Sequence, residues 1–218
     1  MYLSRIELAP ERRETMKALA SPQIMHAAVE ECFSGSWGKA AARKLWRIDR
    51  FQSKTYLLLL SPEKPEFERL SAQFCPDEGK GEIKPYGLLL DRIRPGQKWQ
   101  FKLRANPVHH VKTEAGNEKR GKIYAHITVF HQKEWLLKKA PDCGFEIVRN
   151  DQGHALVDVM KTEHFRFKRQ GRYVTLNMVT FEGVLRITDA KLFSRALING
   201  VGRAKAYGCG LLTIARAI

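Results

Sequence analysis

The order in which strand and helix patterns follow one another is the feature that most limits what this chain can fold into. Alternating apolar residues predict strands, and apolar residues spaced three and four apart predict helices. In the first half the expected elements are a strand at 2–8, a helix that begins at Ser21 and Pro22 and ends near Gly35, strands at 45–51 and 55–60, a helix at 65–74 and a strand at 82–93. This β-α-β-β-α-β order is the signature of a ferredoxin-like unit.

A turn at Arg94-Pro95-Gly96 separates this pattern from a second one of the same kind. The second half is expected to contain a strand at 98–104, a long basic loop at 108–124, a helix at 128–143, strands at 145–148, 155–167 and 173–187, a helix at 189–197 that Asp189 caps, and a strand at 209–215. We therefore expect an α+β protein of two tandem ferredoxin-like (RRM-like) β-α-β-β-α-β domains, at residues 1–94 and 97–218.

The charge of the chain points to a phosphate-bearing partner. Its 218 residues contain 38 Lys and Arg against 23 Asp and Glu, which gives a formal net charge of +15. A nucleic acid is the simplest partner for such an excess. A membrane is the alternative, but no stretch approaches the roughly 18 apolar residues of a spanning helix and no basic amphipathic helix is evident. No membrane partner is expected.

The N-terminus and the cysteines suggest a cytoplasmic protein. Charged residues interrupt the first eight positions, which is not the pattern of a signal peptide. The four cysteines are scattered and form no CxxC pair, so free thiols are expected rather than a structural zinc site.

A glycine-rich segment near the C-terminus is a candidate nucleic-acid-binding loop. Exposed N–H groups in such a loop suit phosphate, and neighbouring cations and an aromatic ring add charge and a stacking surface. The candidate RNA-binding residues here are Gly200, Gly202, Arg203, Lys205 and Tyr207. The alternative interpretation is a helix C-cap and a turn before the final strand.

His26 is the candidate catalytic residue. It falls outside the apolar stripe of the first predicted helix and shares a face with Glu30. Because histidine titrates near neutral pH, it can accept a proton from a ribose 2′-hydroxyl or donate one to a leaving 5′-oxygen. An ordinary surface histidine is the alternative.

Three cations gather near Gln170-Gly171, which lies between two alternating runs and predicts the tip of a β-hairpin. Lys168, Arg169 and Arg172 are therefore candidates for holding phosphates on both sides of a groove. Alternatively, they protect the edge of a sheet. His109-His110 has no third ligand at a telling distance, and the chain lacks P-loop, HExxH and GxSxG motifs, so neither a metal nor a cofactor is expected.

Four stretches, spread over the chain in order, resemble those of a known family. They read MYLS at 1–4, FKLRANP at 101–107, FEGVL followed by ITD within 181–189, and GVGRAKAYGCGLL at 200–212. With these stretches the chain resembles the CRISPR repeat-RNA endoribonucleases of the type I-E system, the CasE family of the RAMP superfamily.

The resemblance implies a fold, a reaction and partners. It implies two ferredoxin-like domains, recognition of a repeat-RNA stem-loop, and one metal-independent cut at the 3′ base of the stem. It also implies that the enzyme stays bound to its product beside other subunits of the Cascade complex. His26 matches the family's catalytic histidine, whereas the tyrosine that precedes it in some relatives is missing. Lys39 or Arg43 is assigned to stabilise charge on the phosphate.

The resulting hypothesis is an endoribonuclease in which the 2′-hydroxyl attacks the adjacent phosphorus and leaves a 2′,3′-cyclic phosphate. A non-catalytic RNA-binding subunit of the same complex is the main alternative, and a pure binder has no need of His26. A generic RRM-like module is a weaker alternative, because no RNP1-like run is present.

We predict that cleavage of the host's repeat RNA survives EDTA. The reason is the lack of a carboxylate cluster or a convincing His and Cys ligand set in the sequence. A cleavage assay with and without chelator checks this. Activity that disappears in EDTA and returns with magnesium would contradict the prediction.

Overall fold

The first half of the chain forms a four-stranded antiparallel sheet. The computed structural model describes residues 1–33, 43–76, 81–111, 122–169 and 171–216. The strands of the first sheet are β1 (Tyr2–Leu8), β2 (Leu45–Phe51), β3 (Lys54–Ser61) and β4 (Glu82–Pro85), and its helices are α1 (Arg13–Ala20), α2 (Pro22–Glu30) and α3 (Glu68–Phe74). The strand order is β2-β3-β1-β4, the split arrangement of a ferredoxin-like domain.

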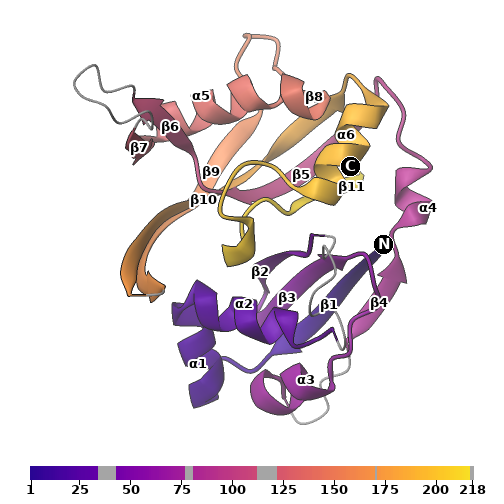
Figure 1. The fold of residues 1–218 in the computed structure, drawn as a ribbon. Helices are drawn as coiled ribbons and strands as arrows, with labels where there is room; N and C mark the ends of the chain where they lie inside the picture. Colours follow the sequence, from indigo (N-terminus) through magenta and orange to yellow (C-terminus); the bar gives the residue numbers. More distant parts are fainter. Residues whose placement is uncertain (34–42, 77–80, 112–121, 170, 217–218) are drawn as a thin grey trace, which may run out of the picture.

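The second half repeats this arrangement with a longer hairpin. Its sheet is built from β5 (Lys98–Ala105), β8 (Phe145–Ile147), β9 (Val157–Arg169), β10 (Arg172–Ile187) and β11 (Leu212–Arg216), with helices α5 (Val129–Lys139) and α6 (Ala190–Asn199) and 3₁₀ turns η1 (Pro141–Cys143) and η2 (Lys205–Tyr207). The order is β11-β5-β10-β8, and β9 pairs with the outer part of β10. The β9–β10 hairpin curves down toward α1 and α2 of the first half (Figure 1).

Several predicted elements are confirmed. Ser21 is the N-cap of α2 with Pro22 in its first turn, and the Asp189 carboxylate accepts hydrogen bonds from the first N–H groups of α6. Arg169 pairs with Arg172 at the end of β9 and β10, so a hairpin forms where the sequence predicted one, although Gln170 itself lies outside the described residues. The chain has the predicted pair of ferredoxin-like folds, and each sheet is made of strands from one side of the Arg94–Gly96 turn. The boundaries 1–94 and 97–218 remain our proposal for the two domains.

Other expectations were wrong. Residues 82–93 are not one strand: β4 ends at Pro85 and is followed by α4 (Gly87–Leu90). The chain leaves the sheet there because Tyr86 and Ile93 pack into the apolar core of the second half. The expected loop at 108–124 begins and ends in two paired strands, β6 (Val108–Val111) and β7 (Lys122–Ala125).

Helix α1 was not predicted, since its sequence carries little apolar signal. Only Thr15 and Ala18 of this helix are buried. The Thr15 hydroxyl donates to the carbonyl of Phe74, so a polar residue fixes the buried face of α1. Three expected features, the Gly35 helix stop, Lys39 and the middle of the 108–124 loop, lie outside the described residues.

The apolar run of β3 explains how the halves come together. Leu57 and Leu59 face the helices of the first half, whereas Leu58 and Leu60 belong to the core of the second half. A strand covered on both faces reads as a continuous apolar run rather than an alternating one. The open face of the first sheet is therefore a packing surface for the second half.

Arg47 of β2 is the polar centre of this junction. Its side chain is 2% exposed, and its guanidinium donates to both carboxylate oxygens of Asp49 at 2.8 Å. It also donates to the carbonyls of Lys102 and Leu211 at 2.9 Å and to the Thr213 hydroxyl at 2.8 Å. These bonds tie β2 to β5 and β11 and satisfy a buried charge.

Two glycines let the C-terminal loop approach β2 closely. A Cβ on Gly200 would lie 2.8 Å from the Leu45 side chain, and one on Gly208 would lie 2.6 Å from the Trp46 ring. Both glycines have positive φ, of 75° and 80°. Because neither position carries a side chain, the backbone of this segment can pack closely against β2.

We predict that Arg47→Met lowers the free energy of unfolding by about 3–5 kcal/mol, since it leaves the buried Asp49 with the more distant Lys102 at 3.6 Å and removes a donor from the carbonyls of Lys102 and Leu211. Urea unfolding measures the loss. Arg50→Met, three residues later at an exposed position, is the control and should change stability by about 0.5 kcal/mol or less.

The pH dependence of the stability gives a second test of the Arg47–Asp49 ion pair. Burial acts to raise the pKa of Asp49, but the hydrogen bonds and charge of Arg47 outweigh it and hold the pKa below its ordinary value. The stabilisation is therefore present above the ordinary carboxyl pKa of about 4 and is lost as the pH falls through the lowered one. Asp49→Asn should remove this part of the acid sensitivity; an unchanged acid profile in that variant would contradict the assignment.

Candidate active site

His26 lies on α2 where the two halves meet. Met25, Ala28 and Val29 turn into the core, which leaves the His26 side chain 33% exposed. Its Nδ1 is 3.9 Å from a carboxylate oxygen of Glu30, one turn later on the helix. The imidazole is thus partly shielded from water and oriented beside a carboxylate.

Lys44 lies beside His26 and Glu30 and was not predicted from the sequence. Its ammonium is 2.6 Å from the other Glu30 oxygen and 4.6 Å from the centre of the Phe33 ring, and its side chain is only 6% exposed. Nothing in the local pattern distinguishes Lys44 from the adjacent Arg43, because both precede the same strand. Glu30 therefore lies between a buried ammonium and an imidazole.

Tyr207 of the glycine-rich segment contacts the imidazole from the second half. The two ring centroids are 6.3 Å apart in an edge-on arrangement, and the Tyr207 ring meets Phe167 of β9 at 4.9 Å. Tyr207 is 7% exposed, so the open stacking surface expected from the sequence is not what the fold presents. The ring instead joins α2, the glycine-rich segment and the hairpin at one point.

The hairpin has an apolar inner face and a cationic outer face. Phe165, Phe167 and Leu176 pack around Tyr207. On the other face, Lys168 is cross-strand from Tyr173, with its ammonium 5.4 Å from the ring centre. The exposed Arg172 is the strand-pairing partner of Arg169 at the end of β9 and β10. The three predicted hairpin cations therefore do lie at the tip, with Lys168 on the outer face.

The residues predicted in the glycine-rich segment have differing surroundings. Arg203 is exposed, whereas the Lys205 ammonium donates to the carbonyl of Asn199 at the end of α6, at 2.7 Å. Gly200 caps α6, as the alternative interpretation of the segment expected, and Gly202 lies against the Trp135 ring.

Positive charge is concentrated around Lys205. Burial, followed by the charge of Arg43, lowers the pKa of Lys205 below its ordinary value. The exposed Arg43 therefore belongs to the same electrostatic neighbourhood as the glycine-rich segment. An anion bound here would relieve repulsion between these cations.

The other side of His26 carries the opposite charge. A hollow of about 770 Å³ opens there; the described residues that line it include Glu30, Glu31, Glu66 and Glu68, and the one cation among them is Arg69. A phosphate chain is repelled from such a wall. A polyanion would reach His26 from the side of the hairpin and the glycine-rich segment.

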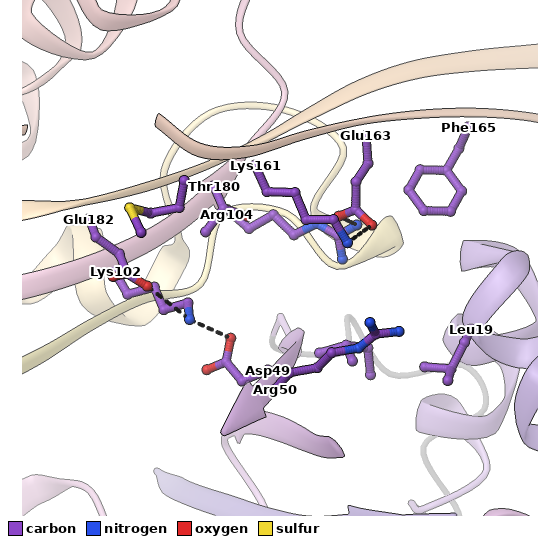
Figure 2. Close-up of a pocket in the computed structure, with 12 residues that line it drawn as sticks. Leu19, Asp49, Arg50, Lys102, Arg104, Lys161, Glu163, Phe165, Thr180 and Glu182 are labelled. Atoms are coloured by element: carbon purple, nitrogen blue, oxygen red, sulfur yellow. Dashed lines mark hydrogen bonds and ion pairs between the residues drawn. The ribbon is translucent and has the colours of Figure 1, made fainter. Parts of the chain in front are cut away.

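A second hollow, of about 270 Å³, lies between the two sheets and is a rival site (Figure 2). Three of the four cations among the described residues that line it are paired with carboxylates, and Arg50 is the exception. Lys102 lies 3.6 Å from Asp49 and 3.0 Å from Glu182, and Arg104 and Lys161 both lie 2.7 Å from Glu163. This internal neutralisation makes the hollow a poor phosphate site.

The cysteines and the helices add two further facts. All four cysteines are buried and none forms a disulfide. Within the described ranges, no three His, Cys, Asp or Glu side chains converge as metal ligands would, and no helix is long and apolar enough to cross a membrane.

Comparison with known proteins gives one consistent relationship. A family model described as CRISPR associated protein matches residues 1–216. The chain is 27% identical to the CRISPR-associated endoribonuclease Cse3 of Thermus thermophilus, over 99% of this chain and 100% of that protein. It is 31% identical to the Cascade subunit CasE of Escherichia coli, over 57% of this chain and 61% of that protein.

A solved structure extends this similarity to the fold. Thermus thermophilus Cse3, bound to an RNA that represents a pre-cleavage complex, superposes with a TM-score of 0.82. The two sequences are 26% identical, and the match covers 98% of each chain.

Proposed function

This chain belongs to the family of CRISPR associated proteins, and we propose that it is an endoribonuclease that cuts CRISPR repeat RNA beside a stem-loop. It remains bound to the product as a subunit of the Cascade surveillance complex, as expected from its similarity to the Cascade subunit CasE. The similarity to an RNA-bound Cse3 over the whole chain supports RNA as the substrate.

One observation carries the proposal: the fold brings His26, the glycine-rich segment and the cationic hairpin to a single point. Tyr207 contacts both the His26 imidazole and Phe167 of the hairpin. These three features are far apart in the sequence and were predicted independently. Their meeting supplies a proton-transfer group next to a surface for the RNA backbone.

The reaction we propose needs only the RNA and side chains. The ribose 2′-hydroxyl loses its proton and attacks the adjacent phosphorus, while the bond to the 5′-oxygen breaks and that oxygen gains a proton. The products are a 2′,3′-cyclic phosphate and a 5′-hydroxyl. His26 serves as the base or the acid, and Lys39 or Arg43 stabilises charge that develops on the phosphate.

Glu30 and Lys44 act through His26 as positioning residues in this scheme. The carboxylate lies 3.9 Å from Nδ1 and can orient the imidazole, and Lys44 balances the charge of the carboxylate. Tyr207 packs against the ring and limits its movement. The stem is held by Lys168, Arg169 and Arg172, and the strand near the cut by Gly200, Gly202, Arg203 and Lys205.

We predict that His26→Ala slows single-turnover cleavage by about 10²–10⁴-fold, the usual size of acid–base catalysis. Affinity for the repeat stem-loop should stay within a fewfold of wild type, because phosphate contacts dominate RNA binding. Cleavage and a binding titration are measured on the same variant.

The control for this variant is His154→Ala, which removes an exposed imidazole from a turn between β8 and β9. It should leave both quantities unchanged. Near-normal cleavage by His26→Ala would remove His26 from the mechanism and favour a non-catalytic RNA-binding subunit. A parallel collapse of affinity would make His26 a binding or structural residue.

A second prediction concerns the hairpin. Replacing Lys168, Arg169 and Arg172 by alanine should weaken repeat-RNA binding and flatten the slope of log K against log salt by about 2–3 units. A matched variant that removes the exposed Lys64 after β3, Lys84 on β4 and Lys98 at the start of β5 should change the slope far less. Equal slopes for the hairpin variant and wild type would show that the hairpin cations serve only solubility.

A further inference from the structure

Strands β6 and β7 lie beside α5 (Figure 1). Side chains from these elements and the segment between them bring five rings into a continuous series. We call it the ring ladder; its members, in spatial order, are Tyr124, His109, His126, His131 and Phe130. Successive ring centroids are 6.0, 4.6, 5.9 and 5.3 Å apart. All but the half-buried His126 are exposed.

Buried amides hold the centre of the ring ladder in place. The His126 carbonyl accepts from Gln132 Nε2 at 3.1 Å and from Asn177 Nδ2 at 2.8 Å, and both amides are buried. The His126 N–H donates to the carbonyl of Pro107 at 3.0 Å. These three hydrogen bonds fix the backbone at His126 before any ligand binds. Binding to the ring would therefore lose little conformational entropy of this segment.

Among the described residues the three imidazoles contact one another as rings and do not converge as metal ligands. The His126 ring lies 4.6 Å from His109 and 5.9 Å from His131, tilted by 34° and 37°. Burial, followed by the charges of His109 and His131, lowers the pKa of His126, so this ring is neutral at pH 7. A neutral ring offers a π-face to a nucleobase.

A groove connects the ring ladder to the proposed active site. The three imidazoles line a hollow of about 310 Å³, and a neighbouring hollow of about 410 Å³ shares Trp135 and Lys139 with it. The second hollow reaches Gly202 and Lys205 of the glycine-rich segment, which also carries Tyr207 at His26.

The charge of the groove favours an anionic chain over a protein partner. Lys138 and Arg203 are exposed, and neither has a carboxylate within ion-pair distance in the described ranges. The acidic residues beside them are Glu134 and the Asp142 that pairs with Lys139. The exposed aliphatic residues nearby, Ile127 and Val129, do not line either hollow.

From this geometry we propose that the groove binds single-stranded RNA flanking the repeat stem, with bases stacked on the ring ladder and phosphates beside Lys138 and Arg203. Rings interleaved with cations are the general solution for holding a single strand. The proposal rests on the proposed function, because it needs the stem to be seated at His26. The bound strand is the one on the 5′ or the 3′ side of the stem, because both sides offer the same bases and phosphates.

The test measures binding of three RNAs that carry a 2′-deoxy sugar at the cleavage site: the stem-loop alone, with a 5′ single-stranded extension, and with a 3′ extension. For wild type, one extension should tighten binding by about 10-fold, the scale of base–aromatic stacking. His109→Ala/His131→Ala should abolish this gain and leave affinity for the stem-loop alone unchanged. His109→Phe/His131→Phe, which keeps the rings, should retain it.

The controls separate this inference from the proposed function. His154→Ala should retain the full gain, and circular dichroism confirms that each variant is folded. Stem-loop binding by wild type with no gain from either extension would overturn the inference alone and assign the ring ladder to another partner, such as a protein. A gain that persists in His109→Ala/His131→Ala would also overturn it. Failure of wild type to bind the stem-loop at all would overturn both proposals.

Discussion

The buried guanidinium of Arg47 is the interaction on which the relation between the two halves depends. A charge at 2% exposure is tolerated only because every guanidinium nitrogen donates to an oxygen of β2, β5 or the C-terminal segment. Apolar contacts such as those of Leu58 and Leu60 are not directional and would let the two halves shift relative to each other. The hydrogen bonds of Arg47 are directional and form in one relative position of the two halves. That relative position places Tyr207 of one half at the edge of His26 of the other.

The distribution of charge separates structural cations from those left for a ligand. Arg47, Lys102 and Arg104 lie between the sheets and are matched by carboxylates. Lys168 and Arg172 at the hairpin tip are exposed. In the glycine-rich segment, burial and then the charge of Arg43 lower the pKa of Lys205. Exposed cations thus lie on the hairpin side of His26, while glutamates line the other side.

Local patterns in the sequence were sufficient to predict most of the fold and the outline of the site. Alternation predicted the strands, turn chemistry predicted the hairpin, and the helical wheel placed His26 off the core. What failed depended on contacts between residues that are not neighbours in the sequence, many of them across the two halves. Arg47 looks like an ordinary exposed strand residue, because no local pattern shows that a second sheet covers it. Tyr207 looked like a stacking platform for the same reason, and Lys44 acquires its role only through Glu30, 14 positions earlier.

The most direct test is a structure of the protein with repeat RNA that carries a 2′-deoxy sugar at the cut site. We predict that the scissile phosphate lies within hydrogen-bond reach of the His26 imidazole, between the hairpin and the glycine-rich segment. A scissile phosphate seated between the sheets, against Lys102 and Arg104, would contradict it.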